Sequence, residues 1–369
     1  MLLRIEKLQD VCKDILTAVD SNELAIITET LEMKVEDHFL VISVTNREYF
    51  TKVKIDIGDT ADFHATVNAE VFLRLISRLT TDTVDMKVEE NNLIIKANGN
   101  YKLPLIYDQE ELLKLPEITI GNITNEFEVD SEILKSILYY NSKELTNKGA
   151  IANPVQKLYY LDQEGCITFT SGACVNSFTL PQPIKILLNN KLVKLFKLFE
   201  GKVKIKIGFD VIGDNLTQLK ICLYTDSIEI TAALPSDESL INAVPASIIR
   251  GMANGEFAYS VNINKNWLGE AIDRLMLFDD KDTIKHYARF VFGTSSVDIY
   301  SVNGENKESV DYNNNCNIDG SYETILDFKD LKNTLDTCNE EYINISFGNN
   351  QSIVIQRGNI RNIIPECNA

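Results

Sequence analysis

The segment NNKLVKLFKLFEGKVKIKI, residues Asn189–Ile207, changes its hydrophobic period half-way along. Apolar residues in its first half are spaced i, i+3, i+4 and i+7, which places them on one face of a helix. They are Leu192, Leu195, Phe196 and Phe199. After Gly201, lysines alternate with valine and isoleucine, as in a half-buried strand. The segment therefore predicts a helix, a glycine stop and a strand.

The same apolar spacing recurs along the chain. Full copies are Leu8, Val11, Cys12 and Ile15; Phe72, Leu75, Ile76 and Leu79; Leu268, Ala271, Ile272 and Leu275; and Leu331, Thr334, Leu335 and Cys338. A weaker copy has Leu134, Ile137 and Leu138. The copies start roughly 60 residues apart, which indicates an internal repeat of six helices. Good N-cap residues, Asn68, Asp130 and Asn264, precede three of these helices.

The segments between the helices alternate like strands. Every second helix is followed by three of them, as in TVDMKVEE, NLIIKAN and NYKLPLIY. Two helix-plus-strands units make about 120 residues, so three such pairs fill the chain. The predicted fold class is α+β, with three similar domains at residues 1–124, 125–245 and 246–369. Each domain has two helices plus antiparallel sheets, and we expect an arc or ring with helices on one surface.

The composition is that of a folded soluble protein, with 44% hydrophobic and 24% charged residues. Seven scattered cysteines without a CxxC pair favour reduced thiols over a disulfide framework, so we expect a cytoplasmic protein. There is no apolar run of membrane-spanning length and no signal-peptide pattern at the N-terminus. The net charge of −18 argues against a wholly basic nucleic-acid binder but allows a local basic surface.

Motifs of catalysis are missing from the sequence. It has no nucleotide-binding glycine loop, no HExxH and no GxSxG. The three histidines are isolated, and the carboxylate pairs fall in loops or at strand ends. We therefore expect no enzyme, no metal site and no cofactor.

Basic residues recur on the helix faces opposite the apolar stripes. Arg74 and Lys194 stand two residues after the first apolar residue of their helices. Arg78 and Arg274 stand six residues after theirs. For any single helix an ordinary solvated face explains this, but the repetition in an acidic protein favours an anion-binding surface. A helix lying on a membrane is disfavoured, because the apolar face is needed for the core.

Pro104 interrupts the predicted strand YKLPLIY. Proline has no N–H for a neighbouring strand, so the strand is predicted to lie at a sheet edge. Such an edge either pairs with another subunit or is covered by its own loop, and the sequence leaves both open. The preceding KANGNYK is predicted to form a hairpin turn.

The chain resembles the bacterial sliding clamp, the β subunit of DNA polymerase III, along essentially its whole length. The firmest likeness lies in VNAEVFLRLISRL, NNLIIKANGNYKLPL and EELLKLPEI of the first domain. VTNREYF, SVNGENKESVDY and IIPECNA are similar to further elements of that family. The resemblance implies a non-catalytic homodimer closed head to tail around double-stranded DNA, without sequence preference. It also implies binding of DNA polymerase and clamp loader through short peptides.

The resemblance further implies roles for individual residues. The predicted DNA contacts are Arg74, Arg78, Lys191, Lys194, Lys197, Arg274, Tyr159 and Tyr160. The predicted partner-peptide pocket comprises Gly172, Cys174, Val175, Asn176, Ile363, Ile364 and Pro365. The predicted dimer interface comprises Leu103, Leu105, Leu277 and Phe278. The family's D-G-H-R-L pocket element is replaced here by GACVN, which indicates a divergent clamp. The alternative is a clamp-fold interaction protein that does not serve the main replicase.

Overall fold

The computed structural model describes residues 1–19, 25–58, 62–145, 153–212, 216–278, 286–301, 303–314, 316–349 and 351–367. They form two compact units. Unit 1 comprises Met1–Glu132 and Lys194–Ser236, and unit 2 comprises Ile133–Val193 and Asp237–Ala369. Each unit combines helices with antiparallel sheets, which confirms the predicted α+β class.

The described part of unit 1 contains a four-stranded sheet, an eight-stranded sheet and a small ribbon of two strands. The four-stranded sheet has the order β1 (Leu2–Arg4), β6 (Thr83–Glu89), β7 (Asn92–Lys96) and β8 (Asn100–Pro104). The eight-stranded sheet has the order β11 (Asn122–Asp130), β16 (Lys202–Ile212), β17 (Leu216–Tyr224), β18 (Ile228–Ala233), β4 (Tyr49–Asp56), β3 (Phe39–Thr45), β2 (Thr30–Glu36) and β5 (His64–Asn68). The ribbon pairs β9 (Tyr107–Asp108) with β10 (Glu111–Leu112).

The described part of unit 2 also contains an eight-stranded and a four-stranded antiparallel sheet. The eight-stranded order is β15 (Lys185–Leu188), β12 (Tyr159–Asp162), β13 (Gly165–Phe169), β14 (Ala173–Ser177), β26 (Ile360–Pro365), β25 (Ser352–Arg357), β24 (Tyr342–Phe347) and β19 (Tyr259–Asn264). The four-stranded order is β22 (Lys307–Asp311), β21 (Ser296–Tyr300), β20 (Tyr287–Phe292) and β23 (Tyr322–Asp327).

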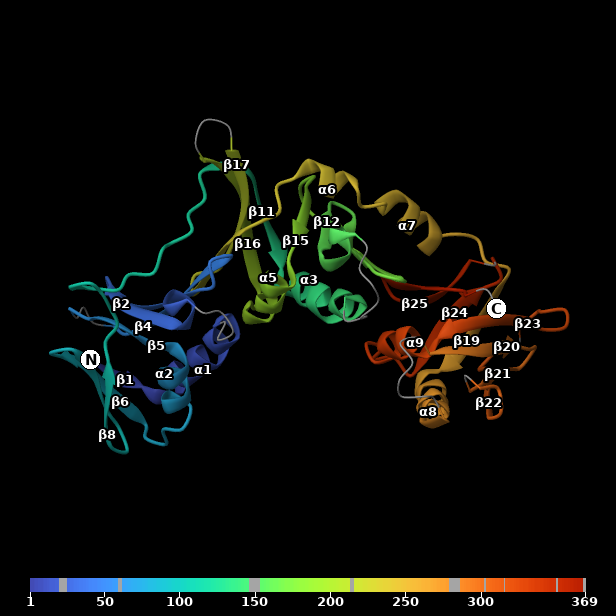
Figure 1. Ribbon diagram of the computed structural model, residues 1–369, viewed down its shortest axis with the longest axis horizontal. Helices are drawn as coiled ribbons and strands as arrows, with labels where there is room; N and C mark the ends of the chain where they lie inside the picture. Colours follow the sequence, from blue (N-terminus) through green and yellow to red (C-terminus); the bar gives the residue numbers. More distant parts are fainter. Residues whose placement is uncertain are drawn as a thin grey trace. The chain divides into compact units, whose positions relative to one another are not determined.

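Helices fall where the apolar spacing predicts them. They are α1 (Ile5–Ile15), α2 (Ala69–Ile76), α3 (Ser131–Ser136), α5 (Asn190–Lys194), α8 (Lys265–Leu275) and α9 (Phe328–Leu335). In unit 1, α1 and α2 lie next to each other, α1 against β4 and α2 against β5 (Figure 1). In unit 2, α8 contacts α9 and strands β19, β21 and β22. The apolar stripes of these helices form the buried core, as in α8, where Leu268, Ile272 and Leu275 are buried.

The predicted N-caps are confirmed. The side chain of Asn68 accepts a hydrogen bond from the Val71 amide at 3.0 Å. The side chain of Asn264 accepts from the second and third amides of α8. The Asp130 carboxylate accepts from the Glu132 amide at 3.2 Å. Each cap satisfies an amide that has no partner within its helix.

Residues 189–207 form the predicted helix, stop and strand. The helix begins as α5 and tightens into a 3₁₀ turn, η5 (Leu195–Leu198). Gly201 then adopts a φ of +67°, which favours glycine, and β16 follows. The alternating lysines of β16 face acidic residues across β11: Lys202 pairs with Asp130 and Lys206 with Glu126, both at 3.6 Å. The basic strand is therefore neutralised locally, as opposite charges on paired strands permit.

The order of strands in the sheets confirms the internal repeat. In one kind of four-strand set, a strand that precedes one helix pairs with the three-strand meander that follows the next helix of the repeat. These sets are β1-β6-β7-β8, β11-β16-β17-β18 and β19-β24-β25-β26. Sets β5-β2-β3-β4, β15-β12-β13-β14 and β23-β20-β21-β22 repeat the complementary arrangement. Each eight-stranded sheet joins one set of each kind, through β18–β4 or β26–β14. The exact domain boundaries stay a prediction.

Some helices have no counterpart in the predicted pattern. Two of them, α6 (Glu238–Asn242) and α7 (Ala246–Ala253), lie on either side of the predicted boundary between residues 245 and 246. A π-helical segment, η3 (Ile137–Asn141), extends α3 and continues into α4 (Ser142–Glu144). Short 3₁₀ turns complete the described elements: η1 (Leu16–Ala18), η2 (Ile26–Glu29), η4 (Pro154–Lys157) and η6 (Met276–Phe278).

Candidate DNA and partner interfaces

The basic residues of α2 and its C-terminal turn lie on the surface. Arg74 forms an ion pair of 2.5 Å with Glu70, one helical turn away, and its side chain is largely exposed. Arg78, just after the helix, is exposed as well. Exposed pairs of this kind contribute only about 0–1 kcal/mol. The Arg74 guanidinium can therefore exchange Glu70 for another anion at little cost.

The lysines of α5 and η5 divide between the surface and partial burial. Lys194 and Lys197 are exposed, whereas Lys191 is half-buried and engaged in interactions of its own. Lys197 also lies close enough to Asp14 of α1 to act on that carboxyl. Partial burial raises the pKa of Asp14, and the charges of Lys13 and Lys197 oppose the rise. The two exposed lysines thus present positive charge on the face away from the core.

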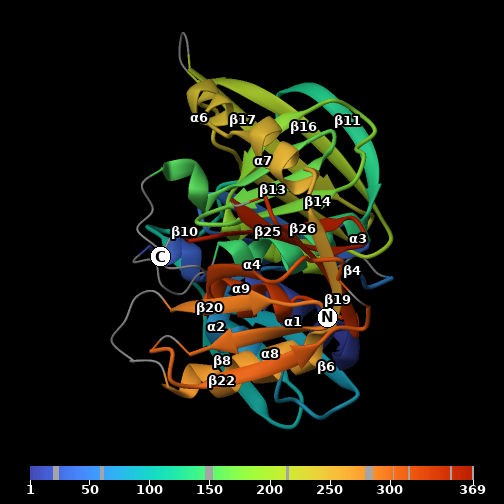
Figure 2. The same cartoon turned by 90° about the vertical axis from the view of Figure 1, so that its right-hand side faces the viewer.

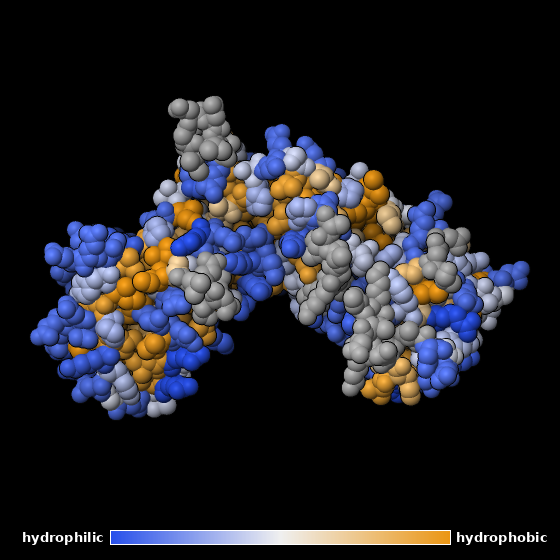
Figure 3. Space-filling view, viewed as in Figure 1, coloured by the Kyte–Doolittle hydropathy of each residue, from blue (hydrophilic) through white to orange (hydrophobic). Residues whose placement is uncertain are grey.

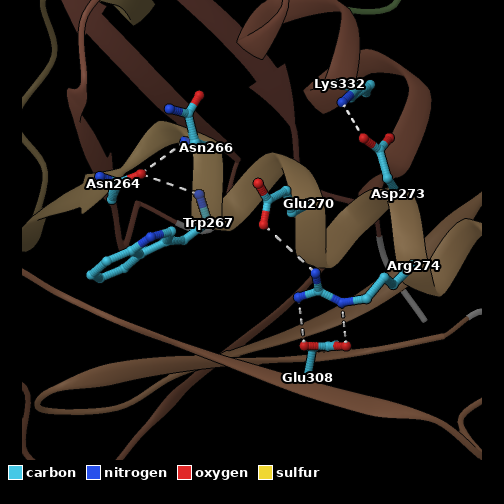
Figure 4. A network of polar contacts seen from close by, with 8 residues as sticks. All are labelled: Asn264, Asn266, Trp267, Glu270, Asp273, Arg274, Glu308 and Lys332. Atoms are coloured by element: carbon cyan, nitrogen blue, oxygen red, sulfur yellow. Dashed lines mark hydrogen bonds and ion pairs between the residues drawn. The ribbon is translucent and has the colours of Figure 1, made fainter.

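Arg274 is the most firmly held of the predicted DNA contacts. Its Nε and Nη2 atoms donate to the two carboxylate oxygens of Glu308 at 2.8 and 3.0 Å, and Glu270 approaches the same guanidinium (Figure 4). The hydrogen bonds that Arg274 donates to Glu308 raise the pKa of Arg274 and lower the pKa of Glu308. Glu308 belongs to β22, so the pair ties α8 to that strand. A contact of Arg274 with phosphate would need to replace a bidentate carboxylate.

Tyr159 and Tyr160 are both buried in unit 2. The hydroxyl of Tyr159 donates to the Asn190 side chain at 2.9 Å, and burial raises its pKa. Tyr160 packs in an apolar cluster with Val175 and Ile363. Both rings support the sheet and α5 in the structure, and their contact with DNA stays a prediction.

The predicted pocket residues meet where β14 pairs with β26. Ala173 stands opposite Ile363, and Val175 stands opposite Arg361. Val175 and Ile363 belong to one apolar cluster. Ile364 belongs to a different core, the one that contains the buried residues of α8 and α9. The remaining predicted residues are also at this junction: Cys174 and Asn176 are buried on β14, and Pro365 ends β26 partly buried. The predicted set thus lies along one strand pair but is divided between its two faces, with Val175 and Ile363 on one face and Ile364 on the other.

Gly172 stands directly before β14, where that strand approaches β26 closely. A Cβ atom at this position would lie 2.4 Å from the carbonyl oxygen of Ile363. Backbone cannot yield as a flexible side chain can, so the junction requires glycine here.

We expect Gly172→Ala to lower the free energy of unfolding by about 1–3 kcal/mol, the usual cost of overpacking. Urea denaturation followed by circular dichroism measures the change. Gly251→Ala is the matched control, because nothing lies within 4 Å of a Cβ added there. Equal stability of the Gly172→Ala variant and the native protein would mean that the two strands can separate freely at this point.

The apolar face of the β14–β26 junction is covered by α7. Ile249 and Ala253 of α7 are buried in the cluster that holds Val175 and Ile363, and α7 contacts both strands (Figure 2). Side chains of α6 pack against the same cluster. Apolar side chains also gather on the outer surface over α6 and α7 (Figure 3), where Ile248 is 64% exposed. The chain itself therefore covers the face of the junction that holds Val175 and Ile363.

Glu144, at the end of α4, lies beside the same junction. Its carboxylate accepts a hydrogen bond of 2.6 Å from the Thr170 hydroxyl and lies near Gly172. Burial raises the pKa of Glu144 from 4.5 to about 7, and the charge of Asp330 acts in the same direction. Asp330 itself accepts from Ser171 at 2.8 Å. The β14–β26 junction thus carries a carboxyl group that titrates near neutral pH.

Stability is expected to fall as the pH rises from about 4.5 to about 7. The folded protein keeps the Glu144 proton over this range while the unfolded chain releases it, which costs on the order of 3 kcal/mol above pH 7. Glu144→Gln removes this dependence, so we expect the variant to be the more stable protein at pH 8 and close to the native protein at pH 4.5. Thermal unfolding across this range tests it; identical pH profiles would contradict the assignment.

Each four-stranded sheet ends in an edge strand, as Pro104 predicts for β8. In β8, Leu103 is buried beneath the edge and Leu105 follows it partly buried. In unit 2 the edge strand is β22; α8 contacts it, and η6 follows α8 directly. Leu277 and Phe278 of η6 are 81% and 52% exposed. These residues provide the exposed apolar groups of the predicted dimer interface.

Solved structures of bacterial clamps share this fold over the whole chain. The DNA polymerase III subunit beta of Borrelia burgdorferi has a TM-score of 0.80 at 14% identity, covering 100% of this chain and 98% of that one. The sliding clamp of Bacillus subtilis has a TM-score of 0.78 at 15% identity, covering 100% and 98%. The Pseudomonas aeruginosa sliding clamp bound to griselimycin has a TM-score of 0.80 at 16% identity, covering 100% and 99%. At such identities the likeness establishes the fold.

Residues 2–115 also match the family model of the DNA polymerase III beta subunit, N-terminal domain. The chain therefore has the fold of the bacterial clamps, and residues 2–115 are similar to the N-terminal domain of the DNA polymerase III beta subunit. No curated protein sequence matches it. The segment that the family model matches contains β1, α1, α2 and β8.

Several features of this chain are not among those predicted from its sequence. The cover that α7 forms over the junction and the buried Glu144 arise from contacts between distant segments. The sequence does contain signals for α6 and α7. DESLIN begins with a good N-cap residue, and in the following AVPASIIRGMA a proline precedes a helix-compatible run with two isoleucines. Among the described residues no cluster of histidine, cysteine, aspartate or glutamate could hold a metal ion. No helix in the described ranges has the length and apolar character needed to cross a membrane.

Proposed function

We propose that this chain is a DNA sliding clamp, a processivity factor that encircles duplex DNA as a head-to-tail dimer and tethers a replicative polymerase. The observation that carries the proposal is the strand order. In the repeat, β8 occupies the place of β18 and β26, and β22 occupies the place of β4 and β14. The pairs β18–β4 and β26–β14 form inside the chain, whereas β8 and β22 are edges in its described part.

Pairing β8 of one copy with β22 of a second copy gives a third eight-stranded sheet of the kind that each unit already contains. The same pairing in both directions uses both edges of both copies, so the assembly closes as a dimer. Unpaired edges of this kind are a liability for a soluble protein, and closure removes it. Leu277 and Phe278, in the turn that follows α8, add exposed apolar area.

DNA passes through the proposed ring along the helices. Arg74, Arg78, Lys194 and Lys197 supply exposed positive charge on helices and helix ends of an acidic chain. Phosphate contacts of this kind carry no sequence information, which suits a protein that slides. The negative charge elsewhere discourages attachment of DNA to other surfaces. No catalytic step and no cofactor is part of this function, and the proposed location is the cytoplasm.

Polymerase and clamp loader are proposed to bind through short peptides at the β14–β26 junction. One observation favours a second candidate function. Since α7 covers the junction, the chain could instead be a clamp-fold protein whose altered pocket serves partners other than the main replicase.

Retention on DNA tests the clamp function. With a clamp loader present, we expect the protein to stay on a circular plasmid and to leave rapidly after linearisation. Light scattering is expected to give a mass of twice 41.7 kDa at micromolar concentration. A monomer, or equal release from circular and linear DNA, would contradict the proposal. A stable dimer that encircles DNA but binds no replicative polymerase would favour the second function.

A further inference from the structure

The apolar surface beneath α7 has the form of a binding site that is already filled. Its residues are Tyr160, Ile167, Ala173, Val175, Val354 and Ile363, and they come from strands β12, β13, β14, β25 and β26. We call this set the junction surface. Ile249 and Ala253, which stand four residues apart on α7, pack against it. A short helical segment with two small aliphatic side chains is therefore the chemistry that the junction surface accepts.

As a helix, α7 is weak by itself. It has eight residues, and its N-cap, Pro245, makes no side-chain capping bond. Isolated helices shorter than about 12 residues are marginal in water. Gly251 stands inside α7, although nothing within 4 Å prevents a side chain there. Glycine at that position destabilises the helix by roughly 0.5–1 kcal/mol relative to alanine without any steric need.

A bidentate ion pair joins α7 to β12. The Nη1 and Nη2 atoms of Arg250 donate to the Asp162 carboxylate at 2.8 and 2.6 Å. Glu164 lies 3.2 Å from the same guanidinium. Both Arg250 and Asp162 are mostly buried, so loss of the pair leaves a charge without its partner. The position of α7 therefore depends strongly on Arg250.

We propose that α7 is a displaceable lid on the junction surface, and that a partner peptide with aliphatic side chains binds there by replacing Ile249 and Ala253. The partner assignment rests on the proposed clamp function, which places the polymerase and loader site at β14–β26. Only molecules with α7 displaced can bind such a peptide. The apparent affinity is therefore the intrinsic affinity multiplied by the fraction of molecules in that state. The lid thus sets how strongly this chain competes for partners.

Hydrogen exchange of the full-length protein, followed by mass spectrometry, tests whether α7 opens independently. We expect the amides of α7 to exchange much faster than those of β14 and β26. Gly251→Ala is expected to slow α7 exchange about two- to fivefold, since it stabilises the helix. Arg250→Gln is expected to accelerate it at least tenfold, and Ile248→Ala, on the exposed face of α7, is the control that changes it less than about twofold. Exchange of α7 at the same rate as β26 in every variant would overturn the lid.

Binding in trans gives a second readout. The probe is a fluorescently labelled synthetic peptide of residues 244–255, the α7 segment itself. We expect Arg250→Gln protein to bind this probe at least tenfold more tightly than the native protein, and Gly251→Ala protein to bind it about two- to fivefold more weakly. Circular dichroism checks that each variant is folded. Equal affinity of all three proteins would contradict displacement.

These measurements are independent of ring formation. A protein that forms a dimer and stays on circular DNA, but whose α7 opens only with global unfolding, would overturn the lid and leave the clamp function intact. A monomer whose α7 exchanges locally and whose junction surface takes the probe would overturn the clamp function and leave the lid intact.

Discussion

Leu277→Asp combined with Phe278→Asp is expected to convert the proposed dimer to a monomer at micromolar concentration. Both side chains are exposed in the single chain, in the turn that follows α8, and α8 contacts the open edge strand β22. Burial of each in an interface contributes about 1.5–3 kcal/mol, and an unpaired carboxylate in its place costs more. The dimer dissociation constant should therefore rise at least about 1,000-fold. Light scattering across a concentration series measures the mass.

The matched control is Ile123→Asp, which replaces a half-exposed apolar residue of β11, a strand that belongs to neither four-stranded sheet. It should leave the mass unchanged. Since Leu277 and Phe278 lie on the surface, both variants should keep the native melting temperature within a few degrees. A double variant that remains dimeric would show that β22 and η6 are not the contact between copies.

The second large effect is expected from the charges on the helices. Replacement of Arg74, Arg78, Lys194 and Lys197 by glutamate should abolish retention on circular DNA at physiological salt. Each lost phosphate contact lowers the salt dependence of log K by about 0.9, and each new carboxylate repels the backbone. Retention of the loaded clamp on nicked plasmid, measured over a salt series, gives both the affinity and the slope.

A control with equal charge change comes from the segment 189–207 itself. Lys194→Gln with Lys197→Gln removes two exposed charges from α5 and η5, whereas Lys202→Gln with Lys204→Gln removes two from β16. Only the first pair is expected to weaken retention and to reduce the salt slope. Equal loss in both pairs would mean that net charge, and not the helix surface, determines binding.

Arg274 shows that the position of a basic residue in the repeat does not predict which group it pairs with. Its offset within the repeat is that of Arg78, since each stands six residues after the first apolar residue of its stripe. The structure pairs Arg274 with Glu308, which is distant in sequence and lies on β22. Spacing along a helix predicts which face a side chain occupies, but the strand that supplies its partner is selected by the tertiary fold.

The paired tyrosines and the pocket residues show the same division. The strand alternation places Tyr159 and Tyr160 on opposite faces of β12, yet both are buried because α5 lies on one side and the α7 cluster on the other. Likewise, the predicted pocket residues do assemble, but the sequence gives no measure of how much α7 would cover them. Burial depends on what packs above a strand. Here the covering helix, α7, is about 70 residues away from β14 in the chain.

The sequence by itself determines the six repeated helices, the strands between them and their repetition. Periods of 3.6 and 2, capping residues and Gly201 act over a few neighbours, so local chemistry is sufficient to specify them. Only the tertiary structure decides that β18 pairs with β4 and β14 with β26, that β8 and β22 stay open, and that α7 fills the junction surface. Those choices depend on apolar faces that become complementary after the elements have formed, and no short stretch of the chain encodes both sides of such a contact.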